Sequence, residues 1–135
     1  MNATLVLADD HPIILDGLEQ LFRLEEGLEV VARCRDGEET LQAVRCHAPD
    51  ILVLDVRMPG ADGIEVLHAL EQEGLATRVV LLTAGLEDEQ LLDAIRSGAR
   101  GVVLKDMAPQ LLVEAVRTVL AGGQWLEKGL GGRAL

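Results

Sequence analysis

Five polar side chains that could bind a cation, act as a nucleophile or stabilise an anion recur along this sequence. They comprise three carboxylates, a hydroxyl and an ammonium group: Asp9, Asp10, Asp55, Thr83 and Lys105. From Asp10 to Asp55 is 45 residues, from Asp55 to Thr83 is 28, and from Thr83 to Lys105 is 22. A strand, a helix and the return loop together take roughly 25 to 30 residues. Two such units therefore separate the acidic pair from Asp55, and one unit precedes each later member.

Together these groups suit phosphoryl transfer. Clustered carboxylates raise one another's pKa unless a cation lies among them, and oxygen-only ligation suits Mg²⁺. With Mg²⁺ and the Lys105 ammonium neutralising phosphoryl oxygens and Thr83 donating a hydrogen bond, Asp55 would be the nucleophile. Taken singly, Asp10 could instead cap a helix, Thr83 could be an ordinary strand residue and Lys105 a surface lysine. A purely structural role is harder to assign to Asp55, because its carboxylate ends an apolar run and would lie uncompensated beside a dry core.

The elements that must position these residues are also visible. Four of five short apolar runs are continuous rather than alternating, which is typical of strands buried on both faces of a parallel sheet. The runs are Thr4–Ala8, Glu29–Cys34, Ile51–Val56, Arg78–Ala84 and Gly101–Leu104. Helix signals lie between them: Pro12, Asp36 with Glu39, Asp62, Ser97-Gly98, and an amphipathic stretch from Pro109 to about Ala121. The pattern predicts a single α/β domain with right-handed (βα)5 crossovers and one ligand-binding edge.

Composition narrows the classes of function. The net charge of −11 and the single Phe and single Trp disfavour binding of nucleic acid or anionic lipid by these residues. Cys34 and Cys46 match no metal-ligand spacing and are expected to be free thiols. No apolar run is long enough for a membrane span and no signal peptide is visible, so we expect a cytoplasmic protein. We assign residues 1–121 to the domain and the glycine-rich residues 122–135 to a linker or a short frayed helix.

The motifs around the five residues resemble the receiver domain of two-component response regulators. The segment from Asp55 to Glu65, Asp-Val-Arg-Met-Pro-Gly-Ala-Asp-Gly-Ile-Glu, is similar to the signature around the phosphorylated aspartate. Ala8-Asp-Asp-His-Pro12 resembles the acidic pair of the NarL/LuxR-type subgroup. Thr83-Ala84 and Gly101-Val-Val-Leu-Lys-Asp106 resemble the motifs of the fourth and fifth strands. The resemblance runs from about Thr4 to Ala121.

This resemblance implies a flavodoxin-like, doubly wound sheet with strand order 2-1-3-4-5. It implies that a sensor histidine kinase donates phosphate to Asp55. It also implies that Mg²⁺ is held by Asp10, Asp55 and the backbone carbonyl of Arg57, with Asp9 assisting. We expect a homodimer, and DNA binding only through a C-terminal helix-turn-helix domain that lies outside this sequence and beyond the linker. The chain itself would be a phosphoacceptor and not an enzyme, apart from slow self-dephosphorylation.

Val102 departs from the family pattern. Receivers usually carry Tyr or Phe three residues before the lysine, and that ring moves when the threonine shifts. Valine offers no ring to move, so we expect weaker switching, or switching through another face or through the first and last helices.

Other functions remain open at this stage. The chain could be a stand-alone phosphotransfer module, or a receiver-like dimerisation module controlled without phosphorylation. In a receiver that drives a DNA-binding output, the apolar stripe of the last helix either faces the core or contributes a dimer face. A haloacid-dehalogenase-type phosphatase would need a second aspartate where Arg57 stands. A flavin mononucleotide binder would need a glycine- and hydroxyl-rich loop after the first strand. His11 is interpreted as a loop or helix-start residue rather than a catalytic base, and Trp125 as packing over an apolar edge.

Overall fold

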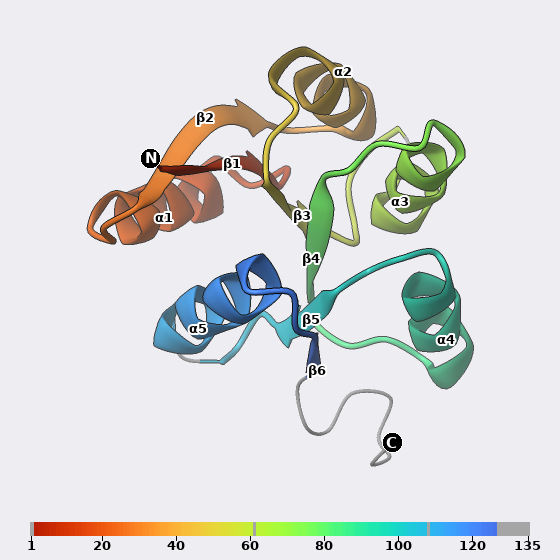
Figure 1. The fold of residues 1–135 in the computed structure, drawn as a ribbon. Helices are drawn as coiled ribbons and strands as arrows, with labels where there is room; N and C mark the ends of the chain where they lie inside the picture. The colour runs from red at the N-terminus through yellow and green to blue at the C-terminus, as the bar shows by residue number, and fades with distance from the viewer. Residues whose placement is uncertain (1, 61, 108, 127–135) are drawn as a thin grey trace.

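The computed structural model describes residues 2–60, 62–107 and 109–126, and these form a three-layer α/β sandwich (Figure 1). The strands are β1 (Ala3–Ala8), β2 (Leu28–Cys34), β3 (Ile51–Asp55), β4 (Arg78–Thr83), β5 (Gly101–Leu104) and β6 (Trp125–Leu126). The helices are α1 (Pro12–Arg23), α2 (Gly37–His47), α3 (Gly63–Gln72), α4 (Asp88–Arg96) and α5 (Pro109–Leu120). All strand pairs are parallel, in the order β2-β1-β3-β4-β5-β6. The predicted fold class and the order 2-1-3-4-5 are therefore confirmed.

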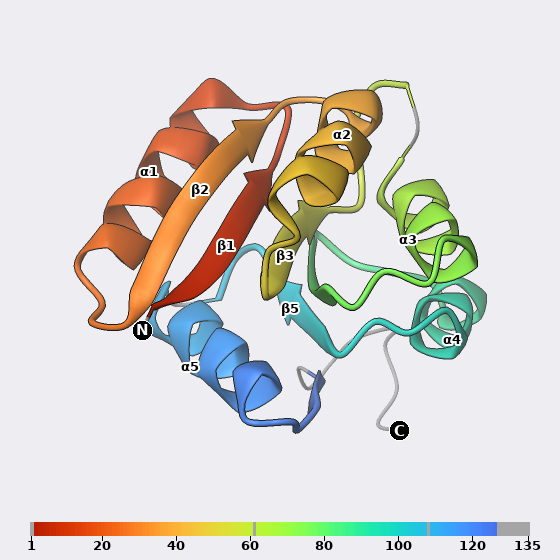
Figure 2. The same ribbon diagram turned by 45° about the horizontal axis from the view of Figure 1, so that its top comes forward.

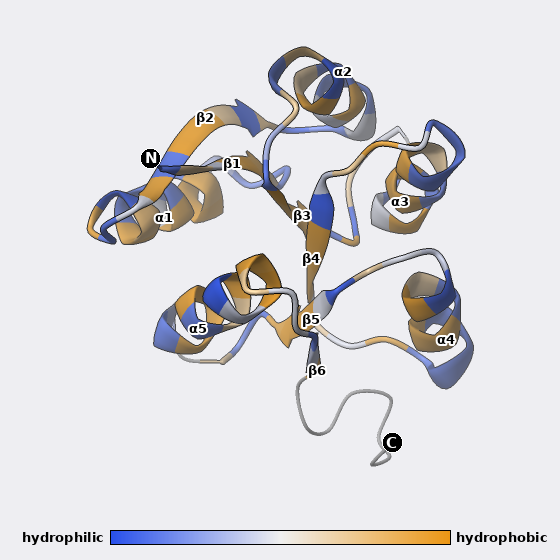
Figure 3. Ribbon diagram, viewed as in Figure 1, coloured by the Kyte–Doolittle hydropathy of each residue, from blue (hydrophilic) through white to orange (hydrophobic). Residues whose placement is uncertain are grey.

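Helices cover both faces of the sheet, as the continuous apolar runs indicated. α1 and α5 lie on one face, and α2, α3 and α4 lie on the other (Figures 1 and 2). All five residues of β3 are buried, as are the last five of β4. In Figure 3, β4 is hydrophobic along most of its length, whereas every helix carries both hydrophobic and hydrophilic positions. Each fully buried aliphatic side chain stabilises the sandwich by roughly 1.5–3 kcal/mol.

The helix ends follow the predicted signals, with one exception. Asp36 accepts a hydrogen bond from the Glu39 backbone N–H, and Asp62 forms a reciprocal capping box with its partner three residues later. α4 ends at Arg96, with Ser97 as its C-cap, followed by Gly98 with φ +100°. At α1 the N-cap is His11, ahead of Pro12 at the first helical position. Asp10 therefore does not cap this helix, which removes the structural alternative considered for it.

The sheet continues beyond Ala121 into a sixth strand that the sequence did not predict. Gly122 has φ +97°, and this positive value lets the chain turn back toward the sheet. The Trp125 N–H then donates to the Arg100 carbonyl (3.0 Å), and β6 pairs with β5. Trp125 packs against the core layer beneath α1 and α5, as expected for an apolar edge. Residues 127–135 of the expected linker lie outside the described residues.

Two further expectations concern cysteines and membrane spans. Cys34 is buried and Cys46 is exposed, and both are free thiols, as expected. Burial raises the pKa of the Cys34 thiol to about 11, so this thiol is protonated at neutral pH. Within the described part of the chain, no helix is both long and apolar enough to cross a bilayer.

Gly63 anchors the start of α3 directly against the end of β3. A Cβ atom at this position would lie 2.6 Å from the Asp55 carbonyl oxygen and 2.7 Å from the Val56 Cα. Both neighbours are backbone atoms, so they cannot rotate away. The Gly63 N–H also donates to the Val56 carbonyl at 2.8 Å. The absence of a side chain therefore brings α3 close to the strand end that carries Asp55.

We expect Gly63→Ala to destabilise the domain by roughly 1–3 kcal/mol, because the added methyl group forces the backbone apart. Urea denaturation followed by circular dichroism measures this change in the free energy of unfolding. Gly17→Ala is the matched control: Gly17 lies within α1 with open space around it, so alanine should stabilise the domain by about 0.5–1 kcal/mol. Equal stability of the two variants would contradict the close approach at Gly63.

Candidate phosphoryl-transfer and metal site

The parallel strands bring the predicted residues to one edge of the sheet. Asp9 directly follows β1, Asp55 ends β3, Thr83 ends β4, and Lys105 directly follows β5. The strands point the same way, so their carboxyl ends share the edge seen at the arrowheads in Figure 2. The register places Ala8 opposite Leu54 and Asp55 opposite Leu82. The site thus forms at the edge where open α/β sheets bind ligands.

Lys105 joins two buried carboxylates. Its Nζ lies 2.8 Å from Asp55 Oδ2 and 3.3 Å from Asp9 Oδ2. Asp9 is fully buried, and only 2% of the Asp55 surface is exposed. Asp55 Oδ1 accepts a hydrogen bond from the Arg57 N–H at 3.1 Å. The ammonium group is therefore the central cation of an otherwise acidic site.

Asp10 completes the group of carboxylates. Ligand atoms from Asp9, Asp10, Asp55 and His11 all lie within 4.8 Å of one another. Asp9 Oδ2 and Asp10 Oδ1 are buried without a hydrogen-bond partner among the described residues. Asp9 Oδ2 has Lys105 within ion-pair distance, but the alignment is too poor for a hydrogen bond, so its charge is only partly compensated.

Such a donor set fits a hard divalent cation. Three carboxylates near a single lysine leave negative charge uncompensated, and buried oxygens without hydrogen bonds are available as ligands. Arg57, whose backbone carbonyl is the remaining expected ligand, is held beside Asp55 by its own N–H, which donates to Asp55 Oδ1. The residues that the family resemblance assigns to Mg²⁺ are thus compatible with it.

Thr83 ends β4 at the same sheet edge as the other site residues, but its hydroxyl group forms hydrogen bonds outside the site. Thr83 Oγ1 accepts a hydrogen bond from the Gly85 N–H at 3.0 Å and donates one to the Gly85 carbonyl at 3.1 Å. The side chain is buried at the end of β4. A hydrogen bond from Thr83 to a group on Asp55 would therefore require the loop after β4 to rearrange.

His11 belongs to the cluster, although its sequence pattern suggested only a helix start. Its Nδ1 lies 3.0 Å from Asp9 Oδ1 and 3.0 Å from Asp10 Oδ1. The helix-start assignment is confirmed, since His11 is the N-cap of α1. The sequence signal that could have placed His11 in the cluster was its position directly after Asp9 and Asp10. However, the direction of the ring depends on the backbone geometry of the turn, which the sequence alone does not provide.

Burial dominates the electrostatics of the site. Burial raises the pKa of Asp55, and the nearby Asp9 charge raises it further, although Lys105 and the Arg57 N–H oppose the shift. Burial lowers the pKa of Lys105, but its ion pairs with Asp55 and Asp9 outweigh this effect, so the pKa is raised overall. Lys105 is therefore firmly cationic at neutral pH, whereas ionised Asp55 is under electrostatic strain.

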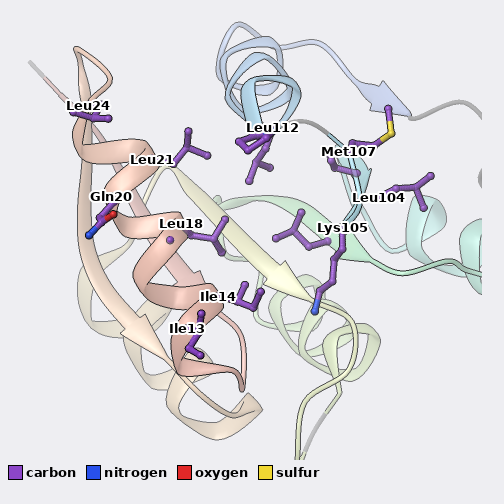
Figure 4. Close-up of a pocket in the computed structure, with 14 residues that line it drawn as sticks. Ile13, Ile14, Leu18, Gln20, Leu21, Leu24, Leu104, Lys105, Met107 and Leu112 are labelled. Carbon is purple, nitrogen blue, oxygen red and sulfur yellow. The ribbon is translucent and has the colours of Figure 1, made fainter.

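Lys105 also lines an apolar groove between α1 and α5 (Figure 4). Leu18 and Leu21 from α1 and Leu112 from α5 form its walls. At the ends of α1, Ile13 and Leu24 are each 84% exposed. A movement of Lys105 would therefore change both the acidic site and this groove.

Comparisons with known proteins agree with this geometry. A family model described as the response regulator receiver domain matches residues 5–117. The chain is 34% identical over 128 residues to the nitrate/nitrite response regulator protein NarL of Escherichia coli (strain K12), covering 95% of this chain and 59% of that protein. It is 35% identical over 127 residues to the oxygen regulatory protein NreC of Staphylococcus epidermidis, covering 93% of this chain and 58% of that protein.

A solved structure supports the same relationship. The crystal structure of a two-component response regulator of the LuxR family from Aurantimonas sp. SI85-9A1 has a TM-score of 0.90 and 34% identity, covering 96% of this chain and 93% of that chain. The present chain spans about three fifths of the length of the two curated relatives.

We expect Asp55→Asn to stabilise the metal-free domain at pH 7, on the order of 1 kcal/mol, because a strained buried charge is removed while Lys105 keeps Asp9. The raised pKa means that the folded state binds the Asp55 proton more tightly than the unfolded state does. Wild type therefore loses stability as pH rises through this pKa, and the difference should shrink as pH falls below it.

Urea denaturation at pH 7 and at mildly acidic pH measures this difference. Asp88→Asn, at an exposed position in the first turn of α4, is the control and should not stabilise the domain. Added Mg²⁺ should favour wild type over Asp55→Asn. An Asp55→Asn variant less stable than wild type in metal-free buffer at pH 7 would contradict the strained carboxylate.

Proposed function

The chain belongs to the response regulator receiver domain family, and we propose that Asp55 is its phosphoacceptor. The observation that carries this proposal is the environment of the Asp55 carboxylate. It is nearly inaccessible at the end of β3, bonded to Lys105 and surrounded by two further carboxylates. A structural ion pair would need only one carboxylate beside the lysine. Three carboxylates instead suit a site that binds a cation and then a phosphoryl group.

The positions of these groups support the following chemistry. An Asp55 carboxylate oxygen attacks the phosphorus atom of a phosphohistidine, an O–P bond forms and the P–N bond breaks. The released imidazole nitrogen takes up a proton from solvent. Lys105, already 2.8 Å from Asp55 Oδ2, neutralises charge on the phosphoryl oxygens. Thr83 exchanges its contacts with Gly85 for a hydrogen bond to the phosphoryl group.

Asp9, Asp10, Asp55 and the backbone carbonyl of Arg57 would hold Mg²⁺. When bound, the ion would supply positive charge close to the phosphoryl oxygens. The protein residues position it: Asp9 is kept in place by the His11 backbone N–H at 2.9 Å. The unpartnered oxygens of Asp9 and Asp10 support this assignment.

Family membership implies a kinase partner, and we propose that it is a cytoplasm-facing sensor histidine kinase. The chain spans only part of its curated relatives, so we propose that a DNA-binding helix-turn-helix domain follows it in the complete protein. We also propose that this chain is not an enzyme in its own right. The position where a phosphatase would need a second aspartate is Arg57.

Two alternatives share this fold. A stand-alone phosphotransfer module would show the same chemistry at Asp55 without an output domain. A dimerisation module controlled without phosphate would keep the fold but leave Asp55 unmodified. The uncompensated acidic site favours the phosphorylated forms over the last alternative.

Phosphorylation can be tested with an acyl phosphate donor and Mg²⁺, read by intact mass. We expect wild type to gain one phosphoryl group in a metal-dependent reaction and Asp55→Asn to gain none. Lys105→Met should slow the reaction by roughly 100-fold or more, because one preorganised cation is lost.

Asp88→Asn, which changes an exposed residue in the first turn of α4, should react like wild type. If wild type binds Mg²⁺ without gaining mass, the unphosphorylated dimerisation module is favoured. If Asp55→Asn is phosphorylated as fully as wild type, the proposed acceptor is wrong.

Most of the apolar stripe of α5 faces the core, which favours a dimer surface elsewhere. Of its residues, Leu112, Ala115, Val116 and Val119 are buried, and Leu111 and Leu120 are partly exposed. We propose that phosphorylation shifts the chain from monomer to dimer. Sedimentation velocity with donor and Mg²⁺ should show a dimer for wild type and a monomer for Asp55→Asn. A phosphorylated chain that stays monomeric at the highest concentration tested would contradict a dimer formed by these residues alone.

A further inference from the structure

The imidazole of His11 occupies a position from which it could bind the same cation as the carboxylates. Its Nδ1 is 3.0 Å from one oxygen of Asp9 and 3.0 Å from one oxygen of Asp10. All three belong to the group whose ligand atoms lie within 4.8 Å of one another. The His11 side chain is 64% exposed, so the ring can meet a cation arriving from solvent without first being uncovered.

The position of the ring is set by the backbone. His11 is the N-cap of α1 in an extended conformation, with φ −99° and ψ 110°. The next residue is Pro12, whose ring restricts φ and so fixes the start of the helix. The His11 backbone N–H donates to Asp9 Oδ1 at 2.9 Å. Residues 9 to 11 therefore form one tight turn that directs two carboxylates and an imidazole toward the same space.

A counter-ion role explains this arrangement only in part. Asp9 Oδ1 forms hydrogen bonds both with the His11 backbone N–H at 2.9 Å and with the ring Nδ1 at 3.0 Å, so the ring adds a second bond to an oxygen that the backbone already satisfies. Asp10 Oδ1 lies 3.0 Å from Nδ1 yet has no hydrogen bond of adequate geometry. The ring is thus close to both oxygens without satisfying the one that lacks a partner.

The spacing matches that of ligands around a single six-coordinate ion. Neighbouring ligands, each about 2.1 Å from such an ion, are roughly 3 Å apart when they subtend a right angle. The distances from His11 Nδ1 to the oxygens of Asp9 and Asp10 have this value. Mg²⁺ prefers oxygen, whereas imidazole nitrogen favours later first-row dications such as Co²⁺, Ni²⁺ and Zn²⁺.

We propose that His11 is an additional ligand of this site and makes the domain prefer a later first-row transition-metal dication over Mg²⁺. The proposal rests on the metal-binding role proposed above for Asp9, Asp10 and Asp55. It adds that Mg²⁺ binds through oxygens alone, whereas a later first-row dication such as Co²⁺ also binds His11 Nδ1. Loss of the imidazole should therefore weaken binding of one class of cation and not of the other.

The test compares Co²⁺ and Mg²⁺ binding by isothermal titration calorimetry to the wild-type chain, His11→Asn and His47→Asn. His47 is an exposed residue in the last turn of α2 and serves as the matched control. We expect wild type to bind Co²⁺ more tightly than Mg²⁺. His11→Asn should weaken Co²⁺ binding by about tenfold or more and change Mg²⁺ binding by less than about twofold. His47→Asn should change neither.

Proton NMR of the Co²⁺-loaded protein provides a direct signature. An imidazole bound through Nδ1 keeps an exchangeable N–H on its other nitrogen, and nearby Co²⁺ shifts this signal strongly. The signal should be present in wild type and His47→Asn and absent in His11→Asn. If His11→Asn loses stability to urea, His11→Gln provides a second variant for the same two measurements.

Three outcomes would overturn the inference. These are equal weakening of Co²⁺ and Mg²⁺ binding in His11→Asn, unchanged Co²⁺ binding in that variant, or persistence of the shifted N–H signal. The acyl phosphate experiment with Mg²⁺ separates this inference from the proposed function. If Asp55 is phosphorylated but the affinity for Co²⁺ does not depend on His11, only the inference fails. If Co²⁺ binding depends on His11 but Asp55 gains no phosphoryl group, only the proposed function fails.

Discussion

Repulsion among three carboxylates at one sheet edge is the constraint on which the rest of this structure depends. Asp9, Asp10 and Asp55 approach within 4.8 Å, a geometry that no isolated peptide would keep. Lys105 offsets part of the repulsion through Asp55 and Asp9. The remaining cost, visible in the raised pKa of Asp55, must be met by the apolar layers behind the site. The site therefore lowers the free energy of unfolding of the metal-free domain and favours the binding of positive charge.

The scaffold offsets this unfavourable electrostatic free energy by burying its strands on both faces, and it allows little movement behind the site. β3 and β4 are almost entirely inaccessible, so their ends cannot shift without opening the core. Gly63 brings the α3 backbone into direct contact with the backbone at Asp55 and Val56. The nucleophile proposed here is therefore held by main-chain packing from behind and by Lys105 in front. A small change in charge at Asp55 would act on Lys105 and on the loops before it acts on the strand.

How much the sequence predicts depends on how local the signal is. The strands, the caps at Asp36 and Asp62 and the gathering of Asp9, Asp55 and Lys105 follow from apolar runs, capping patterns and the shared edge of a parallel sheet. β6 was missed because two residues are too short for a periodic signal, and their pairing depends on the turn at Gly122. The His11 ring was missed because its direction is set by three-dimensional geometry. The chemical roles of the site residues stay predictions, since proximity alone does not establish them.

The same geometry limits how a phosphoryl group on Asp55 could be sensed at the surface. The Thr83 hydroxyl forms two hydrogen bonds with the Gly85 backbone. Its movement toward Asp55 must therefore displace the loop before α4. Val102, where many receivers carry an aromatic ring, is fully buried beneath the α2, α3 and α4 layer and has no ring to fill a vacated space. Lys105 offers a second route, because it lines the groove between α1 and α5 as well as the acidic site. A change of charge at Asp55 can therefore reach the groove between α1 and α5 through Lys105 without passing through Val102.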